Sequence, residues 1–375
     1  MTGGPSRRSA MTNSSNAASE MVSLPSCLSR NSDRAPAQRP EWRRASAGGG
    51  GLPPTLHVPR PNLPPVPETL LTTSVERAAA VLRRGGTVAF PTETVYGLGA
   101  SALDAGAVAA VFQAKGRPAD NPLIVHVAEA DAVGALAVVT DAAAALLAAF
   151  APGPISLVLR QRGGLPAAVT AGLDTVAVRV PGDGLALSLV RAAGVPVVAP
   201  SANRSGRPSP TTWEAVRDDL GGRIDAIVQG PPAAVGIEST VVDATGAVPV
   251  VLRPGAVSLE ALRAVVPSTV AWAEAAGPAR SPGLRHRHYA PRARVHLVEA
   301  GRQPGADAAY IGLDPPAPGY AAVAVCPTVE AYARRLFAFF READAAGLRR
   351  IDAQTVPEDG LGRALLDRIR RAAEP

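Results

Sequence analysis

The sequence nearly lacks lysine: of its 38 basic residues, only Lys115 is not arginine. Arginine presents a planar fork of donors, whereas lysine presents a compact ammonium that approaches a phosphate as a point charge. This lysine lies in the segment Ala114-Lys115-Gly116-Arg117-Pro118. We therefore take Lys115 as the first candidate for phosphate binding, with a chance survivor of codon drift as the alternative.

Cysteine and long apolar runs are also scarce. The two cysteines, Cys27 and Cys326, lie far apart, which excludes a disulfide framework or a CxxC metal site and fits a reducing compartment. No apolar run reaches the ~20 residues that a membrane-spanning helix needs. We expect a cytoplasmic protein with no membrane partner.

Acidic residues are rare near the N-terminus. Residues 1–66 contain eight arginines and three acidic residues, Glu20, Asp33 and Glu41. This segment therefore carries +5 of the net charge of +6. The rest is close to neutral, which argues against a broad basic face for nucleic acid. We expect the Arg/Ser/Pro/Gly-rich residues 1–66 to be a disordered leader. A transit peptide or a wrongly assigned start codon are the alternatives.

Periodicity and capping signals between residues 67 and 277 predict an α/β domain. Helices and strands do not strictly alternate there, which favours a twisted mixed sheet with flanking helices. Apolar periodicity with Ser or Asp caps and Gly stops predicts helices over residues 74–84, 104–115, 131–137, 141–150 and 185–193. Short apolar runs predict strands over residues 87–90, 123–127, 155–160, 175–180, 196–199, 226–228, 239–242 and 250–252.

A second, smaller α/β domain is expected over residues 294–375. Its predicted strands are residues 294–298, 309–311 and 321–325, and its predicted helices are residues 329–345 and 361–372. The chain is long enough for two such domains.

The two expected domains are joined by a Pro/Gly/Arg/His-rich linker, residues 278–293. Arg285 and Arg287 alternate there with His286 and His288, a pattern that fits an RNA or phosphate patch. The histidines are also candidate metal ligands, but no cysteine or carboxylate lies nearby to complete a site. We therefore expect no metal ligand from the protein.

Polar clusters follow several predicted strands, where α/β folds place their ligands. Residues 91–99, PTETVYGLG, combine two hydroxyls, a carboxylate and a phenol on what we interpret as a glycine-flanked turn. Residues 115–122 place Lys115 and Arg117 two apart on a Gly/Pro-rigid loop, from which they can surround a triphosphate. No Walker A motif is present. An ordinary turn and a solvated surface are the respective alternatives.

Two further clusters lie later in the chain. Ser201 and Asn203, in residues 200–211, project to the same side if the segment is extended. Residues 236–240 enter a strand, and Arg253 closes the next one. Ser, Asn, Gly and Pro are also ordinary loop residues, so each cluster alone says little about function.

Taken in order, these segments resemble the YrdC-like family in its two-domain form, the threonylcarbamoyl-AMP synthases. The family's K-x-R…S-x-N tetrad falls on Lys115, Arg117, Ser201 and Asn203. The shared segments are PTETVYGLG, AKGRPxDNPL, PGP, AVRVP, PSANxSGxPSPT, GIEST, LRPG, SPG…HYAP and GLGRALLDRIRRAA. The resemblance covers about residues 67–375. Two departures are Ser156 in place of a threonine and Leu284 in place of a methionine.

The resemblance implies a YrdC-like twisted mixed sheet, a smaller C-terminal Rossmann-like domain and a linker that acts as a lid. It also implies a nucleotidyltransferase that makes L-threonylcarbamoyl-AMP from L-threonine, bicarbonate or CO2, and ATP, with release of pyrophosphate. Mg²⁺ would accompany ATP, with no tightly bound cofactor. The product would supply a downstream threonylcarbamoyl transferase complex that modifies tRNA to N6-threonylcarbamoyladenosine.

The resemblance also implies roles for individual residues. The catalytic set would be Lys115, Arg117, Ser201 and Asn203. ATP would be held by Arg117, Asn121, Asn203, Thr211, Arg253 and the linker residue Tyr289. Threonine would be held by Thr94, His126, Ser201 and Ser239, with Arg179 as a further carboxylate or phosphate partner. His126 taken alone equally fits a core histidine.

Two other functions remain alternatives. Hydrogenase maturation enzymes that form a carbamoyl adenylate share this domain, but they carry acylphosphatase and zinc-finger regions that this sequence lacks. A non-catalytic double-stranded-RNA-binding module is the other. The near-neutral charge of residues 67–375 argues against strong RNA binding and leaves weak RNA binding open.

Overall fold

The computed structural model describes residues 68–271, 288–305 and 307–374. Within these residues the strands form two sheets, one of eleven strands and one of four. The expected leader, residues 1–66, lies outside the described residues. So do linker residues 278–287, which include Arg285, His286 and Arg287. The domain boundaries therefore stay predictions.

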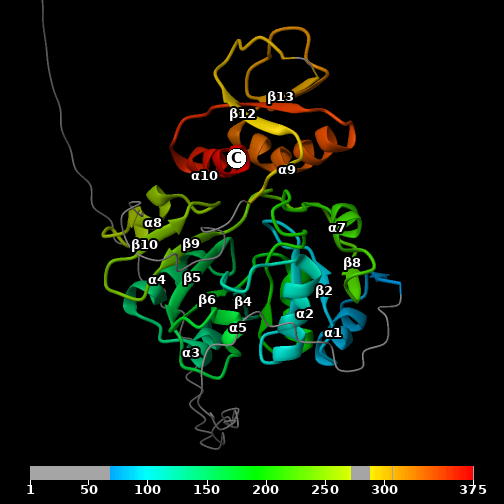
Figure 1. Ribbon diagram of the computed structural model, residues 1–375. Coiled ribbons are helices and arrows are strands. Elements are labelled where there is room, and N and C mark those ends of the chain that lie inside the picture. The colour runs from blue at the N-terminus through cyan, green and yellow to red at the C-terminus, as the bar shows by residue number, and fades with distance from the viewer. Residues whose placement is uncertain (1–67, 272–287, 306, 375) are drawn as a thin grey trace, which may run out of the picture. The chain divides into compact units, whose positions relative to one another are not determined.

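The large sheet is mixed and runs across Figure 1 from β10 and β9 on the left to β8 on the right. Its strands are β1 (Leu70–Thr72), β2 (Val88–Phe90), β3 (Gly97–Ser101), β4 (Ile124–His126), β5 (Ile155–Arg160), β6 (Thr175–Arg179), β7 (Val197–Val198), β8 (Ala226–Val228), β9 (Thr240–Asp243), β10 (Val250–Arg253) and β11 (Val270–Ala271). They lie in the order β1-β8-β2-β3-β7-β4-β6-β5-β9-β10-β11. Strand β2, for example, pairs antiparallel with β3 and parallel with β8.

Helices flank this sheet, and several begin at the caps that the sequence predicts. They are α1 (Val75–Arg83), α2 (Ala105–Lys115), η1 (Ala130–Ala132), α3 (Val133–Leu136), α4 (Asp141–Phe150), α5 (Ala167–Thr170), α6 (Gly184–Ala193), α7 (Trp213–Leu220) and α8 (Leu259–Val265). The Ser74 side chain accepts from the Arg77 amide at the start of α1, and Asp104 caps α2 in the same way. In the described part of the chain, no helix has both the length and the apolar character needed to cross a bilayer.

Both faces of the large sheet are buried around β2. In β2, Val88 and Phe90 belong to the apolar core on one face, and Ala89 belongs to the core on the other. Helices α1 and α6 pack on the first face, and α2, α4 and α7 contribute to the second core. Because side chains alternate along a strand, helices on both faces explain why these strands read as continuous apolar runs.

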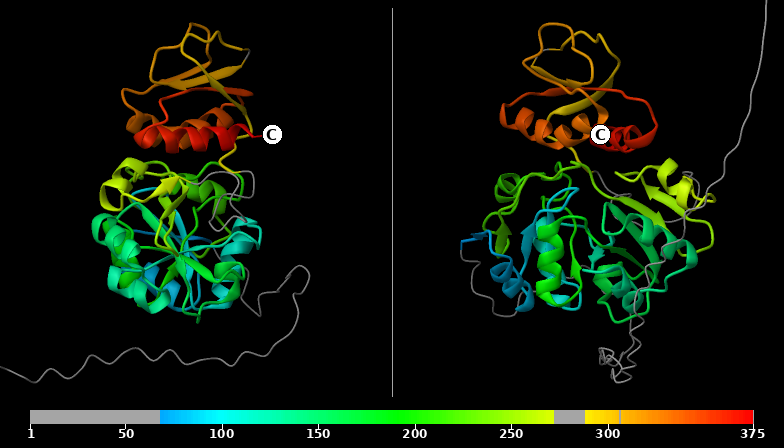
Figure 2. Two further views of the ribbon diagram at one scale, coloured as in Figure 1. Left: turned by 90° about the vertical axis from the view of Figure 1, so that its left-hand side faces the viewer. Right: turned by 180° about the vertical axis from the view of Figure 1, so that it is seen from behind.

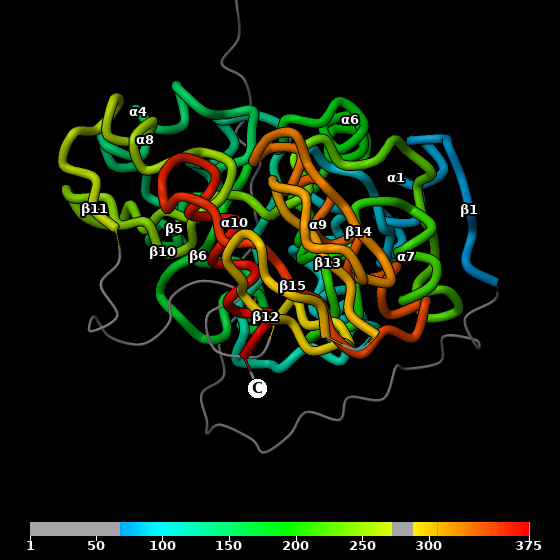
Figure 3. Tube along the Cα trace, turned by 90° about the horizontal axis from the view of Figure 1, so that it is seen from above, coloured from blue at the N-terminus to red at the C-terminus, as the bar shows by residue number. Residues whose placement is uncertain are grey.

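The small sheet is parallel throughout. Its strands are β12 (Arg294–Val298), β13 (Ala308–Gly312), β14 (Ala322–Val325) and β15 (Arg350–Gln354). They lie side by side in the order β12-β15-β13-β14 (Figure 3). Helices α9 (Val329–Ala345) and α10 (Gly360–Ala373) cover one face of this sheet (Figure 2). Their core includes Val95 and Ile237, which lie within the polar clusters 91–99 and 236–240, so α9 and α10 pack against the site region.

The structure confirms the fold class and most predicted elements to within one or two residues, with α4, β5, β8, β12 and α9 matching at both ends. The interpretation of residues 91–99 as a turn was wrong for the last three residues, because Gly97 starts strand β3. A Cβ at Gly99 would come within 2.7 Å of the Phe90 ring, so glycine permits this close strand pairing. Strands β1, β11 and β15 and helices α5, α7 and α8 were not predicted.

Candidate active site

One pocket gathers most of the predicted site residues. Nine of the twelve line it, namely Thr94, Lys115, Arg117, Arg179, Ser201, Asn203, Ser239, Arg253 and Tyr289. The cationic pair at the end of α2 and the serine–asparagine pair after β7 thus open onto the same cavity, although they are far apart in the sequence. A pocket with a few converging polar groups is the usual form of a ligand site.

Lys115 joins the two pairs directly. Helix α2 ends immediately after it because Gly116 adopts a left-handed conformation, with φ of 61°. The ammonium Nζ donates to the carbonyl oxygen of Asn203 at 2.6 Å and also to that of Ser201. Since an ammonium has three donors, one remains for a ligand. Burial, and after it Arg117, lowers the pKa of Lys115 well below that of an ordinary lysine.

Arg117 is held by its own loop. Its Nε donates to the Asn121 carbonyl at 3.1 Å, and its Nη2 donates to Asn121 Oδ1 at 2.7 Å and to the Pro122 carbonyl at 2.8 Å. These bonds fix the planar guanidinium at the pocket. Burial lowers the pKa of Arg117 to about 10, so the group stays cationic at neutral pH. Asn121 thus orients Arg117 from outside the pocket lining.

Asn203 presents an unused acceptor. Its Nδ2 donates to the carbonyl oxygens of Arg204 and Arg207, each at 2.9 Å. Its Oδ1 is buried and has no hydrogen-bond partner among the described residues. Buried polar atoms are normally paired, so this oxygen marks a place where a donor on a ligand fits. Ser201 lies beside it, with its backbone bridged to Gly97.

Arg179, on β6, ties the first polar cluster to the sheet. Its Nη2 donates to Glu93 Oε1 at 2.7 Å and to Thr94 Oγ1 at 3.0 Å. The two charged side chains are 6% and 15% exposed. Burial alone would raise the pKa of Glu93, but the charge and hydrogen bond of Arg179, together with backbone hydrogen bonds, lower it. The ion pair therefore keeps Glu93 ionised and sets the position of the Thr94 hydroxyl.

Ser239 and Arg253 also line the pocket and contact each other. Ser239 Oγ lies 2.8 Å from Ser156 Oγ, so the serine that replaces the family's threonine supplies the hydroxyl partner. Arg253 Nη2 donates to the Ser239 carbonyl at 2.9 Å and to Ser239 Oγ at 3.2 Å. These bonds order a hydroxyl group and a guanidinium at one rim of the pocket.

Tyr289, in the expected linker 278–293, also lines the pocket. Its side chain is 5% exposed and stacks on Phe337 of α9 with ring centroids 5.4 Å apart. Its φ of 65° is rare for a bulky residue, and the packed ring holds it in place. His288 also lines the pocket. Its Nε2 is buried without a partner among the described residues, and burial, ahead of Arg117, lowers its pKa to about 3.

The structure does not bring three predicted residues into the pocket lining. Asn121 contacts Arg117, as described above. Thr211 is buried, and its carbonyl accepts from the Ala233 amide. His126 is buried in β4, with Nδ1 3.3 Å from the Ile124 carbonyl oxygen. Their assignment to ATP or threonine binding stays a prediction.

His126 should make the protein sensitive to acid. Burial, and after it Arg179, lowers the pKa of His126 from 6.5 to about 3. Between these values the unfolded chain binds a proton that the folded chain does not, so the free energy of unfolding falls as pH falls. One such proton changes it by about 1.4 kcal/mol per pH unit. We expect His126→Gln to flatten the slope measured by urea unfolding between pH 6.5 and 4.

His296→Gln is the control for that measurement. His296 lies partly exposed on β12, and its pKa is also lowered, by burial and Arg350. Its replacement should change the slope less than His126→Gln does. Equal slopes for the wild-type protein and His126→Gln would contradict the neutral, buried state of His126.

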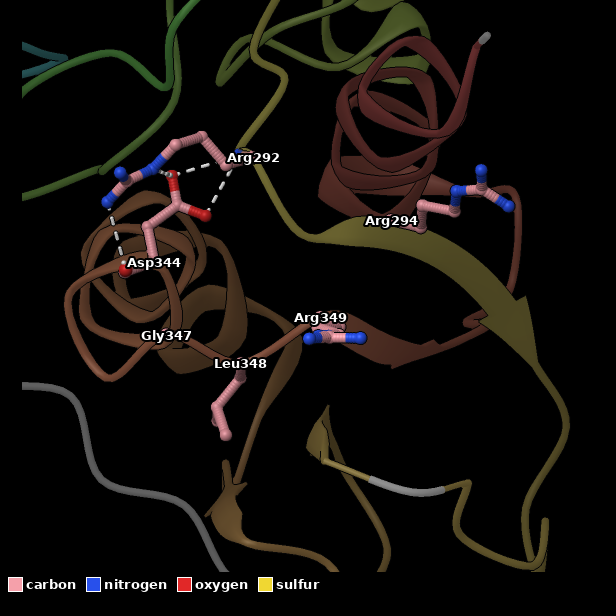
Figure 4. A pocket seen from close by; sticks show the side chains of 6 residues that line it. All are labelled: Arg292, Arg294, Asp344, Gly347, Leu348 and Arg349. Atoms are coloured by element: carbon pink, nitrogen blue, oxygen red, sulfur yellow. Dashed lines mark hydrogen bonds and ion pairs between the residues drawn. The ribbon is translucent and has the colours of Figure 1, made fainter.

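A second hollow lies beside the start of β12 and the end of α9. It is lined by Arg292, Arg294, Asp344, Gly347, Leu348 and Arg349 (Figure 4). The Asp344 carboxylate accepts from the Arg292 amide at 2.8 and 2.9 Å. The Arg294 side chain points away from this pair, and Arg294 and Arg349 are exposed. The hollow therefore has no set of polar groups converging on one point.

The sequence does not reveal the partners that hold the site residues in place. Glu93 and Glu238 were each noted only as part of a motif, yet each carries a buried ion pair, with Arg179 and Arg368 respectively. A lone carboxylate inside a polar motif was the available signal. Its partner is 86 residues away for Glu93 and 130 for Glu238, so only the fold can pair them.

The fold and the pocket define an α/β protein with a cation-lined site suited to an anionic ligand. Comparison with known proteins identifies the family within this class. A family model for Sua5, YciO and YrdC, described as telomere recombination, matches residues 80–255. A model for the threonylcarbamoyl-AMP synthase C-terminal domain matches residues 257–374.

Individual relatives agree with both models. Threonylcarbamoyl-AMP synthase of Pyrococcus abyssi is 43% identical over 79% of this chain and 93% of its own length. The enzyme of that name from Bacillus subtilis is 40% identical over 80% of this chain and 92% of its own. The crystal structure of P. abyssi Sua5 with L-threonine superposes with a TM-score of 0.75, covering 81% of this chain and 96% of that one. The chain belongs to the two-domain threonylcarbamoyl-AMP synthase family.

Proposed function

We propose that this chain makes L-threonylcarbamoyl-AMP and pyrophosphate from L-threonine, bicarbonate or CO2, and ATP, as a nucleotidyltransferase. Family membership supports the reaction. The observation that carries it is the convergence of Lys115 and Arg117 with Ser201 and Asn203 on one pocket. The P. abyssi relative, crystallised with L-threonine, supports threonine as the amino-acid substrate.

The reaction needs positive charge more than proton transfer. The threonine amine adds to CO2 and loses a proton, which gives a carbamate. A carbamate oxygen then forms a bond to the α-phosphorus of ATP while the bond to the bridging oxygen breaks and pyrophosphate leaves. Lys115, Arg117 and Arg253 line the pocket and stabilise the charge that grows on the pyrophosphate. The carbamate is already an anion, so no protein general base is required for the attack.

Mg²⁺ would enter with ATP and not on protein ligands. Among the described residues that line the pocket, Glu238 is the one carboxylate, and Arg368 pairs with it at 2.7 Å. The donor set therefore fits a metal held by the phosphates of the nucleotide. When bound there, Mg²⁺ would neutralise phosphate charge.

The hydroxyl side of the pocket suits threonine. The Arg179 guanidinium would receive the carboxylate, and the hydroxyls of Thr94 and Ser239 would hydrogen-bond the amino acid. Tyr289 is buried against α9 and would exclude water from a product that is a hydrolysable mixed anhydride. The product would pass to a threonylcarbamoyl transferase complex that acts on tRNA in the cytoplasm.

Pyrophosphate release tests the proposal. Purified protein with ATP and Mg²⁺ should release pyrophosphate only when threonine and bicarbonate are both present, and mass spectrometry should detect threonylcarbamoyl-AMP. Turnover that is indifferent to threonine would contradict the proposal. RNA binding without any turnover would favour the RNA-binding alternative.

A further inference from the structure

Arg368 on helix α10 is completely buried and uses every nitrogen of its guanidinium. It is the largest fully buried side chain of the described residues, with 0% exposure. Its Nε donates to Glu238 Oε2 at 2.7 Å, Nη1 to Asp367 Oδ2 at 2.5 Å and Nη2 to the Pro254 carbonyl at 3.0 Å. The guanidinium also lies over the Tyr289 ring, 5.3 Å from its centroid. The guanidinium of an arginine from the small-sheet domain thus contacts segments that contain pocket residues.

Two of these contacts flank pocket residues. Glu238 directly precedes Ser239, and Pro254 directly follows Arg253. The backbones of these two segments touch, since a Cβ at Gly255 would lie 2.2 Å from the Thr240 amide nitrogen. One guanidinium therefore fixes the start of β9 and the end of β10, where Ser239 and Arg253 face the pocket.

Arg368 also has an electrostatic effect, on the carboxylate of Glu238. Glu238 lines the pocket in which we propose that the anionic ATP binds, and its side chain is 9% exposed. Burial alone would raise the pKa of Glu238, but the charges of Arg368 and Arg253, together with hydrogen bonds from Ser209 and Arg368, lower it. The group is therefore a carboxylate, and without a counter-charge it would repel a triphosphate. A buried charge left without its partner is also costly.

We propose that Arg368 is a positioning residue for the nucleotide: it neutralises Glu238 and holds Ser239, Arg253 and Tyr289 in place for ATP. This inference rests on the proposed function. It gives the C-terminal domain a defined part in the site, because Arg368 of α10 is the side chain that forms the direct ion pair with Glu238. Arg368 does not line the pocket, so it acts through its contacts.

The test is a double-mutant cycle with steady-state kinetics on the full chain. Arg368→Met should raise the KM for ATP about tenfold, with a smaller change in kcat, because an uncompensated carboxylate faces the phosphates. Adding Glu238→Gln should recover most of that loss, since it removes the repelling charge. The control is Arg370→Met on the same helix, where Arg370 is 52% exposed and pairs with Glu358. The control should keep the wild-type KM.

Recovery in the double variant separates a charge effect from a packing effect. If Glu238→Gln does not lower the KM of Arg368→Met, or if folded Arg368→Met keeps the wild-type KM, the proposal is overturned. If Arg368→Met fails to fold, Arg368→Lys carries the test. It keeps the charge but not the fork, so it should raise the KM about threefold, and an unchanged KM would overturn the proposal. A wild-type protein that makes no threonylcarbamoyl-AMP would instead refute the proposed function.

Discussion

Lys115→Ala is expected to reduce threonylcarbamoyl-AMP formation by about 10²–10³-fold or more, as removal of a single transition-state donor typically does. The ammonium is 3% exposed and bonds the carbonyl oxygens of Ser201 and Asn203. Its loss removes a charge from the pocket and also the link between the Lys115–Arg117 pair and the Ser201–Asn203 pair. Rates of pyrophosphate release at saturating ATP measure the effect.

The matched variants for this prediction are Lys115→Met and Gln113→Ala. Methionine keeps the apolar stem, so a similar loss in Lys115→Met assigns the effect to the charge. Gln113 is exposed on the same helix, and its replacement should leave the rate unchanged. Normal product formation by folded Lys115→Ala would remove Lys115 from the mechanism.

The pKa of Lys115 adds a pH dependence. Burial lowers it well below the ordinary lysine value of 10.5. The ammonium is therefore lost, and the rate falls, at a lower pH than an exposed lysine would give. Bound triphosphate would oppose this shift, because a nearby anion favours the charged form.

Local signals in the sequence predicted much of the fold. Ser74 and Asp104 cap helices, and Gly116 stops one, because each acts on the backbone within a few residues. Strand β15, residues Arg350–Gln354, was missed because its polar residues break the apolar pattern. Asp352 is nevertheless fully buried, paired with Arg350 at 2.6 Å and bonded by Tyr320. Such burial depends on partners that only the folded chain supplies.

The site likewise contains residues that the sequence marks and residues that it does not. Residues that face the ligand, such as Lys115 and Asn203, occur in recognisable clusters, because polar groups gather on short loops at strand ends. Arg368 sits in an amphipathic helix among Arg363, Arg370 and Arg371, and the sequence does not mark it among these arginines. Its role follows from the complete burial of its side chain in the folded protein, and composition does not reveal which arginine is buried.

Arg179→Met is expected to cost both stability and activity. The substitution leaves Glu93 buried without its counter-charge, which typically destabilises a protein by ~3–5 kcal/mol. It also removes the donor to Thr94 Oγ1, so threonine-dependent turnover should be lost. Urea unfolding and pyrophosphate release measure the two effects separately. The exposed pair Arg160–Asp174, at 63% and 75% exposure, is the control, and Arg160→Met should cost no more than ~1 kcal/mol.

A second substitution distinguishes the structural part of this pair from its part in binding. Adding Glu93→Gln to Arg179→Met removes the unpaired charge, so most of the lost stability should return. Turnover should not return, because the guanidinium that would receive the threonine carboxylate is still missing. Recovery of both quantities would mean that Arg179 serves only to neutralise Glu93. Recovery of neither would mean that Arg179 is needed for packing, through its bond to the Gly153 carbonyl, and not for its charge.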